Sequence, residues 1–213
     1  MEAIAMKDSK QFWDKSAEKY VKSPIKDEAS YQKKLAMTRE YLNSESHILE
    51  FGCGSGGTSI LHAPHVKSIL ATDISDKMIE IAQQKSAEVN VTNIQFQQGT
   101  LDDLNEQDES FDAVLGLNVL HLIEDVDGAI EKAYKLLKNG GTFVSSTSLI
   151  GEVNIVFRWI ISAMQSLGLA PHVSALTRDQ LIHKLETVGF TIEHEWKIQQ
   201  FQVCELTDLW LKR

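Results

Sequence analysis

The strongest local signal in this sequence is Ile48-Leu49-Glu50-Phe51-Gly52-Cys53-Gly54-Ser55-Gly56-Gly57. Its apolar start continues a predicted strand, and its glycines lead into a helix predicted near residues 56–63. Glycine lets the backbone turn tightly and approach a ligand where any Cβ would clash. The helix N-terminus beyond the turn offers unpaired N–H groups. The spacing Gly-x-Gly-x-x-Gly also fits the dinucleotide fingerprint, so the glycines alone do not choose between cofactors.

Two acidic residues lie near this glycine turn, each where a strand is expected to end. Glu50 stands two residues before Gly52 and is expected to direct a carboxylate into the ligand crevice. A carboxylate there suits a cofactor with an amino group better than a pyrophosphate, whose negative charge it opposes. Asp73 ends the next predicted strand, 21 residues after Gly52. An acidic side chain at that place can accept both hydroxyls of a ribose.

Strands and helices are predicted to alternate through the middle of the chain. Apolar runs typical of strands cover residues 46–51, 66–72, 94–97, 113–117 and 142–146, and helical patterns cover residues 76–88 and 127–138. Residues 9–42 favour two helices, broken near Pro24. This alternation predicts an α/β fold, a Rossmann-like, doubly wound sheet with helices on both faces.

The carboxyl end follows a different pattern. Thr177-x-x-Gln180 is a capping box, and Gly189 is expected to end the helix that the box begins. Two strand-like runs follow at residues 190–197 and 200–206, and so short a connection permits only an antiparallel pair. We therefore expect a seven-stranded sheet, mostly parallel, with a C-terminal antiparallel hairpin.

Composition argues against several classes of partner. The 213 residues include 21 Lys plus Arg against 30 Asp plus Glu, a formal net charge of −9. An acidic surface repels phosphate backbones and anionic lipid, so we expect neither nucleic acid nor a membrane surface as partner. Cys53 and Cys204 lie far apart, which favours a reducing compartment. Neither a signal peptide nor a membrane-spanning helix is indicated, so the expected location is cytoplasmic.

Further motifs give the chain a family resemblance that covers nearly its whole length. With the glycine turn and Asp73, they resemble the class I S-adenosylmethionine-dependent methyltransferases. Phe111-Asp112-Ala-Val-Leu-Gly-Leu-Asn118-Val-Leu-His121 resembles that family's fourth strand, and Leu136-Leu-Lys-Asn-Gly-Gly141 resembles its Leu-Leu-Lys-Pro-Gly-Gly turn. Phe12-Trp13-Asp14-x-x-Ala17-x-x-Tyr20 is similar to the small-molecule branch that includes the quinone-biosynthesis methyltransferases. The resemblance implies an enzyme that transfers a methyl group from S-adenosyl-L-methionine directly to O, N, S or C of a small molecule.

The resemblance also implies which residues bind this cofactor. They are Glu50, Gly52, Cys53, Gly54, Gly56, Asp73, Ile74, Met78, Thr100, Leu101 and Asn118. Glu50 is expected near the ammonium group, Asp73 at the ribose and Asn118 beside the transferred methyl. Members of the family often have Gly-Asp where this chain has Gly99-Thr100. Asp102 or Asp103 is therefore expected to take over the contact with the adenine amino group.

Two residues are candidates for a catalytic role. His121 follows the fourth strand and is suited to accept a proton from an attacking hydroxyl or amine, although packing or capping explains it as well. Tyr20 is suited to bond the cofactor carboxylate, or belongs to an ordinary helix surface. His62 and His65 have no nearby Cys, Asp or Glu cluster. They are expected in a solvated loop, and no metal is expected.

The whole chain, residues 1–213, is expected to form one domain with four parts. These are an N-terminal helical lid (1–43), a cofactor-binding core (44–150), a helical insertion (151–176) and a C-terminal helix and hairpin (177–213). Within the insertion, the apolar segment 153–170 is expected to roof the pocket of an apolar or partly aromatic substrate. Packing on the sheet, or on a second copy of the chain in a homodimer, explains the segment equally well.

Other functions stay open at this point. A base methyltransferase typically has Asn/Asp-Pro-Pro-Tyr/Phe after the fourth strand, where this chain has Leu117-Asn118-Val119-Leu120. A protein arginine methyltransferase would carry paired glutamates in that region. Glu50 and the hairpin disfavour a nicotinamide oxidoreductase. A non-catalytic regulator that binds S-adenosylmethionine fits the same motifs.

Overall fold

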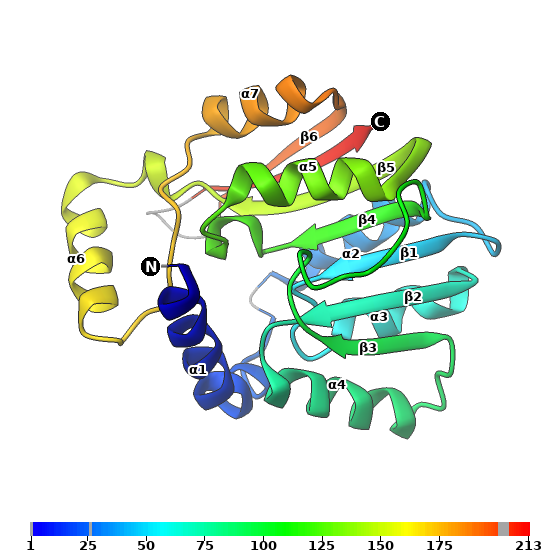
Figure 1. Cartoon of the computed structure of the whole chain (residues 1–213), viewed down its shortest axis with the longest axis horizontal. Coiled ribbons are helices and arrows are strands. Elements are labelled where there is room, and N and C mark those ends of the chain that lie inside the picture. The colour runs from blue at the N-terminus through cyan, green and yellow to red at the C-terminus, as the bar shows by residue number, and fades with distance from the viewer. Residues whose placement is uncertain (1, 26, 200–204) are drawn as a thin grey trace.

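The structure is a computed structural model that describes residues 2–25, 27–199 and 205–213. One sheet has the strand order β3-β2-β1-β4-β5-β7-β6 (Figure 1). The strands are β1 (His47–Phe51), β2 (Ser68–Asp73), β3 (Ile94–Gln98), β4 (Phe111–Leu117), β5 (Leu137–Ser148), β6 (Thr191–Gln199) and β7 (Glu205–Lys212). Strands β1 to β5 run parallel, and β7 pairs antiparallel with both β5 and β6. The predicted fold class is confirmed.

Helices cover both faces of this sheet. One face carries α5 (Val126–Leu136) and α7 (Arg178–Val188), and the other carries α2 (Glu28–Arg39), α3 (Gly57–His62) and α4 (Asp76–Glu88). Two helices lie outside these layers: α1 (Glu2–Val21) runs beside α4, and α6 (Ile155–Ser166) stands away from the sheet (Figure 1). Short 3-10 turns follow α3 (Ala63–His65), β4 (Leu120–Leu122) and β5 (Ile150–Glu152). Within the described residues, no helix has the length and apolar character needed to cross a membrane.

The central strands are buried on both sides, as the continuous apolar runs predict. Phe143 of β5 is fully buried and connects the parallel half of the sheet to its C-terminal end. Its ring lies 5.3 Å from that of Phe190 and 6.3 Å from that of Phe51, measured between centroids. The core that supports the strand ends therefore depends on contacts between segments far apart in sequence.

Two predicted boundaries are wrong. α5 ends at Leu136, two residues early, because Leu137 already pairs with Phe111 as part of β5. The last strand ends at Lys212 rather than at residue 206. Its predicted start, at residue 200, falls within residues 200–204, which lie outside the described residues. β7 lies between β5 and β6, so both its edges are paired, and the run 209–211 is buried in the core clusters on the two faces of the sheet.

The substitution Phe143→Ala should destabilise the protein by about 3–5 kcal/mol, because it leaves a cavity between two aromatic rings. Chemical denaturation followed by far-ultraviolet circular dichroism measures the change. Phe157→Ala is the matched control, since Phe157 of α6 is 45% exposed. We expect the control to change stability by less than about 0.5 kcal/mol. Equal losses in the two variants would contradict this account of the core.

Candidate functional site

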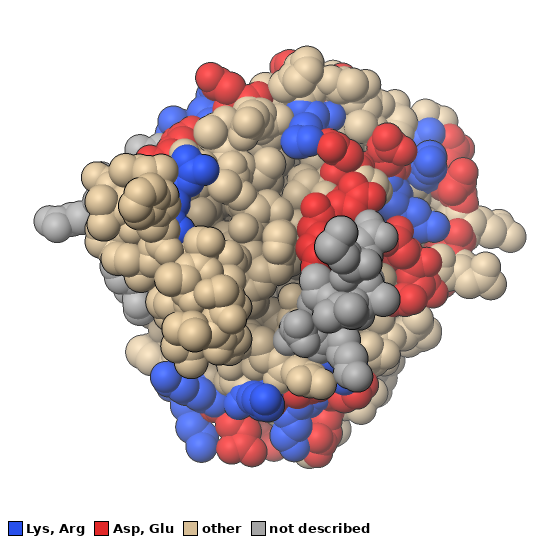
Figure 2. Space-filling model, turned by 60° about the vertical axis from the view of Figure 1, so that its left-hand side comes forward, with Lys and Arg blue, Asp and Glu red and all other residues tan. Residues whose placement is uncertain are grey.

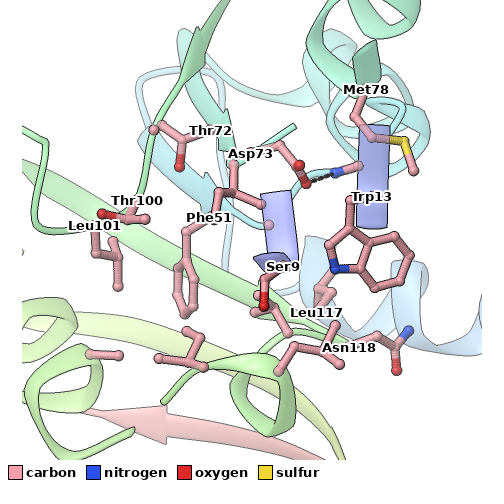
Figure 3. A pocket seen from close by; sticks show the side chains of 18 of the residues that line it. Ser9, Trp13, Phe51, Thr72, Asp73, Met78, Thr100, Leu101, Leu117 and Asn118 are labelled. Atoms are coloured by element: carbon pink, nitrogen blue, oxygen red, sulfur yellow. Dashed lines mark hydrogen bonds between the residues drawn. The ribbon is translucent and has the colours of Figure 1, made fainter. Parts of the chain in front are cut away.

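Two cavities open where the parallel strands end. They share five lining residues, namely Tyr20, Gly52, Gly54, Leu117 and Asn118. The apolar cavity has a volume of about 320 Å³ and is lined mainly by Trp13, Phe51, Ile74, Met78, Leu101, Val119, Leu122 and Ile123 (Figure 3). The polar cavity has a volume of about 400 Å³ and is lined by Tyr31, Lys34, Glu50, Ser55, Thr58 and Lys85, among others. Since the strands are parallel, this edge of the sheet is where such folds bind ligands.

The glycine turn after β1 separates the two cavities. Gly52, Gly54 and Gly56 all have positive φ, at 65°, 52° and 73°. A Cβ on Gly52 would lie 2.4 Å from Val119 Cγ2, and one on Gly56 would lie 2.8 Å from Ala82 Cβ. At Gly54 the nearest atom to such a Cβ is in the Tyr20 ring, at 3.9 Å. Gly52 and Gly56 are therefore required by packing, whereas Gly54 keeps the wall of both cavities free of a side chain.

Asp73, at the end of β2, holds this turn in place. Its Oδ2 accepts a hydrogen bond from the Gly54 N–H at 2.8 Å (Figure 3), and its Oδ1 accepts one from the Ser75 N–H at 2.9 Å. Burial raises the pKa of the Asp73 carboxyl, and these two hydrogen bonds partly oppose the rise. The carboxylate lines the apolar cavity. It thus both fixes the backbone and presents acceptor oxygens to a ligand.

Glu50, at the end of β1, lines the polar cavity. Only 2% of the residue is exposed, and Ser59 Oγ donates a hydrogen bond to its Oε2. Burial raises the pKa of the Glu50 carboxyl to about 7, and the nearby Asp73 adds to the rise. Cys53 lines the same cavity, and burial raises the pKa of its thiol well above the usual value. A protonated thiol is a poor nucleophile, so Cys53 contributes a small side chain rather than reactivity.

Asp102 and Asp103, which the sequence did not distinguish, have different roles in the structure. Asp103 Oδ2 accepts hydrogen bonds from the Thr100 N–H at 2.8 Å and from Thr100 Oγ1 at 2.9 Å, so Asp103 closes the turn after β3. Asp102 lines the cavity. The predicted residues Ile74, Met78, Thr100 and Leu101 line it as well.

Asn118 ends β4 at the junction of the two cavities. It is one of the few non-glycine residues with positive φ, at 56°. Its N–H donates to the Ser146 carbonyl at 2.8 Å, and its Oδ1 accepts from Ser146 Oγ at 3.2 Å. β5 therefore holds Asn118 in this uncommon conformation.

The structure leaves two predicted site residues away from the cavities. Gly56 is the N-cap of α3 and serves packing, as described above. His121 belongs to the lining of neither cavity. Its Nδ1 accepts a long hydrogen bond, 3.4 Å, from the Ser148 N–H, and burial lowers its pKa to about 4. His62 corrects another expectation: it is fully buried at the end of α3, not in a solvated loop.

Several lining residues escaped the sequence analysis, and Lys34 is the most informative of them. Lys34 of α2 is 6% exposed and donates from Nζ to Ser146 Oγ at 3.2 Å. Asp208 Oδ1 lies 3.7 Å from the same nitrogen. A usable signal existed, because Lys34 falls at helical spacing with Tyr31, Leu35 and Thr38, on the face of α2 that the sheet covers.

A set of polar contacts holds α1 over the cavities. Asp14 Oδ1 accepts hydrogen bonds from Ser75 Oγ at 2.7 Å and from the Lys77 N–H at 3.2 Å. Lys10 pairs with Asp14 at 3.0 Å and with Asp76 at 2.6 Å. These contacts clamp α1 to the start of α4. They bring Trp13 and Tyr20, whose rings meet edge to face at 5.9 Å, to the cavity openings.

α6 makes no comparable attachment within the described residues and lines neither cavity. None of its side chains is buried, and Trp159 is 73% exposed. Figure 2 shows the side of the molecule that carries α6, where uncharged residues cover much of the surface beside a hollow. The expectation that this segment packs on the sheet is therefore not met.

Comparisons with known proteins agree with this geometry. Residues 49–145, from within β1 to within β5, match the family described as methyltransferase domain. This stretch of the chain is similar to a methyltransferase domain. Within the described residues, no group of three or more His, Cys, Asp or Glu side chains is arranged to hold a metal ion.

Three similar methyltransferases place the chain more closely. The uncharacterized methyltransferase YcgJ of Bacillus subtilis is 27% identical over 80% of this chain and 66% of its own length. Its crystal structure has a TM-score of 0.71 at 18% identity, over 85% of this chain and 99% of that one. A ubiquinone biosynthesis O-methyltransferase of Chelativorans sp. is 32% identical over 57% of this chain and 51% of its own length.

The third is phosphoethanolamine N-methyltransferase 2 of Haemonchus contortus, solved in complex with phosphomonomethylethanolamine and S-adenosylhomocysteine. Its TM-score is 0.73 at 14% identity, over 86% of this chain and 53% of that one. The chain thus spans between 39% and 66% of the length of curated methyltransferases that it matches in sequence. These matches confirm the expected resemblance to methyltransferases in sequence and in fold.

Gly54→Ala should leave the methyltransferase folded but weaken binding of S-adenosylhomocysteine at least tenfold, because the new methyl group would face the cavities. Gly52→Ala is the matched comparison, since it incurs a similar cost of positive φ, about 1–2 kcal/mol. It adds a clash with Val119 and should be clearly less stable. Thermal unfolding and titration calorimetry measure the two effects. Normal binding by the folded Gly54→Ala protein would show that the turn does not contact the cofactor.

Proposed function

We propose that this protein binds S-adenosyl-L-methionine across both cavities and transfers its methyl group to a small-molecule nucleophile. One observation carries the proposal: an apolar cavity with a carboxylate, Asp73, joins a polar cavity with a buried carboxylate, Glu50. Such a pair of cavities suits a ligand with a nucleoside at one end and an amino acid at the other. The joint volume also lies in the range of small-molecule sites.

The residues present fit the nucleoside. A carboxylate has about four lone-pair positions, and the described hydrogen bonds to Asp73 use two of them. Asp73 therefore keeps acceptor capacity for the ribose hydroxyls. Ile74 and Met78 supply apolar surface for the adenine, and Asp102 supplies an acceptor for its amino group. Gly54, bare of a side chain, allows the ligand to pass from one cavity to the other.

The chain's contribution to catalysis is alignment. When bound, the cofactor supplies an activated methyl group on a sulfonium that leaves as a neutral thioether. Asn118 and the glycine turn lie where the two halves of the ligand meet, so they orient its reactive centre. Correct orientation supplies a large share of the rate enhancement in such reactions without a dedicated acid or base. Trp13 and Tyr20 on α1 shield the opening from water.

His121 stays a prediction as general base. Burial lowers its pKa to about 4, so the imidazole is neutral near pH 7 and holds a lone pair. Ser148 already donates to Nδ1, and the ring lies outside both cavities. A role in catalysis therefore requires the 3-10 turn of Leu120–Leu122 to move when a substrate binds.

We infer an apolar or partly aromatic methyl acceptor, with residues 1–43 as lid and residues 153–170 as a second cover or a contact with another copy. The apolar lining by Trp13, Leu122 and Ile123 supports this inference. The similarity to a ubiquinone biosynthesis O-methyltransferase points in the same direction. The charge of −9 favours such an acceptor over a nucleic acid.

Titration calorimetry with S-adenosylmethionine, S-adenosylhomocysteine and NAD tests the binding step. We expect both sulfur compounds to bind and NAD not to bind. Turnover with a panel of phenols, amines, thiols and quinols then tests catalysis and identifies the methylated atom. Binding of NAD alone would contradict the proposal, and binding without turnover on any member of the panel would favour a regulator.

Cofactor affinity should fall with acid as Glu50 loses its charge. The Glu50 carboxyl has a pKa of about 7 in the ligand-free protein, so it is ionised above pH 7 and neutral below. An ammonium group is recognised by the ionised form, so affinity should fall about tenfold for each pH unit below 7. Calorimetry with S-adenosylhomocysteine between pH 7.5 and 5.5 measures the slope.

Glu50→Gln is the control for this slope, because Asp73 titrates in the same region of the site. The variant should bind more weakly at pH 7.5 and lose most of the pH dependence. An unchanged slope in Glu50→Gln would assign the dependence to another group.

A further inference from the structure

Lys34 is a buried cation in the wall of the polar cavity. It lies on α2, 6% exposed, and its Nζ reaches Ser146 Oγ at 3.2 Å. Ser146 Oγ in turn donates to Asn118 Oδ1 at 3.2 Å, so Lys34 is linked to the junction of the two cavities. An ammonium group has three donors, and the Ser146 hydroxyl occupies one. Lys34 therefore keeps donor capacity toward the cavity that it lines.

Asp208 of β7 is the anion that accompanies this cation. It is fully buried, and its Oδ1 lies 3.7 Å from Lys34 Nζ. Burial raises the pKa of the Asp208 carboxyl, and its polar neighbours Lys34 and Ser146 partly oppose the rise. A buried lysine without an anion would tend to lose its proton. At 3.7 Å the contact places an opposite charge beside Lys34, yet it leaves the ammonium group able to bind a second carboxylate.

Glu50 lines the same cavity with the opposite charge. The Lys34 charge acts on the Glu50 carboxyl and partly opposes the rise of its pKa. A cation and an anion in one enclosed polar space of about 400 Å³ match the two charges of a free α-amino acid group. Neither charge alone would distinguish such a group from a simple amine or a simple acid.

We propose that Lys34 binds the α-carboxylate of the cofactor's methionine part and that Asp208 positions Lys34 for this contact. The proposal rests on the proposed function and deepens it. It assigns to Lys34 the contact with the cofactor carboxylate that the sequence suggested for Tyr20. Tyr20 is 52% exposed, so water competes for its hydroxyl.

The other cation in the cavity wall is Lys85, whose Nζ donates to Ser55 Oγ at 2.9 Å. Burial lowers the pKa of Lys85.

The test compares two ligands that differ only in the amino acid part. S-adenosylhomocysteine carries the carboxylate, and 5′-methylthioadenosine has the same nucleoside thioether without it. In Lys34→Met, affinity for S-adenosylhomocysteine should fall about 10- to 100-fold, the range for a lost charge-assisted hydrogen bond. Affinity for 5′-methylthioadenosine should stay within about twofold. Titration calorimetry on the full chain measures both.

Lys33→Met is the matched control on the same helix. Lys33 is exposed, and its Nζ lies 4.0 Å from the centroid of the Trp196 ring, outside the cavity. This variant should bind both ligands as the unmodified protein does. Lys85→Met tests the competing assignment, in which Lys85 binds the carboxylate. If the loss specific to S-adenosylhomocysteine appears in Lys85→Met and not in Lys34→Met, the proposal is overturned.

Removal of Lys34 alone leaves Asp208 buried without its cation and can prevent folding. The double variant Lys34→Met/Asp208→Asn removes both charges and should show the same selective loss. Asp208→Asn alone should weaken S-adenosylhomocysteine binding by about 3- to 10-fold, and the double variant should be no weaker than Lys34→Met. Equal losses for both ligands in the double variant would show a structural role and overturn the proposal.

The outcome for the unmodified protein separates this proposal from the one it rests on. If that protein binds neither ligand, the proposed function fails. If it binds S-adenosylhomocysteine and every Lys34 variant keeps the same ratio of the two affinities, the proposed function stands and the assignment of Lys34 fails.

Discussion

The hydrogen bond from the Gly54 N–H to Asp73 Oδ2, at 2.8 Å, is the contact on which the arrangement of both cavities depends. It ties the turn after β1 to the end of β2, and a second bond, from the Cys53 N–H to the Thr72 carbonyl at 2.9 Å, reinforces it. A hydrogen bond to a charged acceptor contributes about 1.5–3 kcal/mol. The turn it stabilises needs positive φ at Gly52 and Gly54, which only glycine adopts cheaply.

Buried carboxylates give the proposed site a negative character that would favour a ligand with positive charge. Glu50, Asp73 and Asp208 are three acids whose pKa is raised by burial, and Lys34 is the cation placed among them. Burial of a negative charge without a partner costs free energy. A cationic ligand would reduce this cost by supplying the missing opposite charge. The net charge of −9 adds a long-range attraction of the same sign.

The segments outside the sheet differ in how firmly they are attached. Asp14 and Lys10 secure α1 to the start of α4 through three described contacts, which fixes Trp13 and Tyr20 over the cavities. No buried side chain secures α6. The proposed cofactor site is thus built on strand ends, and the proposed acceptor site depends on segments added to the common fold. That division is consistent with one fold serving relatives with different substrates.

Local sequence was sufficient for the alternation of strands and helices, the glycine turn and the acids at the ends of β1 and β2. These features depend on periodicity and on backbone conformations that few residue types adopt, so neighbouring residues reveal them. It was sufficient, too, for the antiparallel hairpin, because a short connection allows no other pairing. It was not sufficient for the C-terminal end of β7, since the run 209–211 is buried only by core clusters that form on the two faces of the folded sheet.

The pairing of Lys34 with Asp208 also required the folded chain. The two residues are 174 positions apart, and the sequence around each gives no indication that they pair. The same holds for His121 and His62, whose burial and lowered pKa follow from the elements packed around them. Residue type and spacing indicated which groups have the chemistry to bind a cofactor. Only the tertiary structure decided which of them share a cavity, because the distance and shielding between charges depend on segments that meet in space.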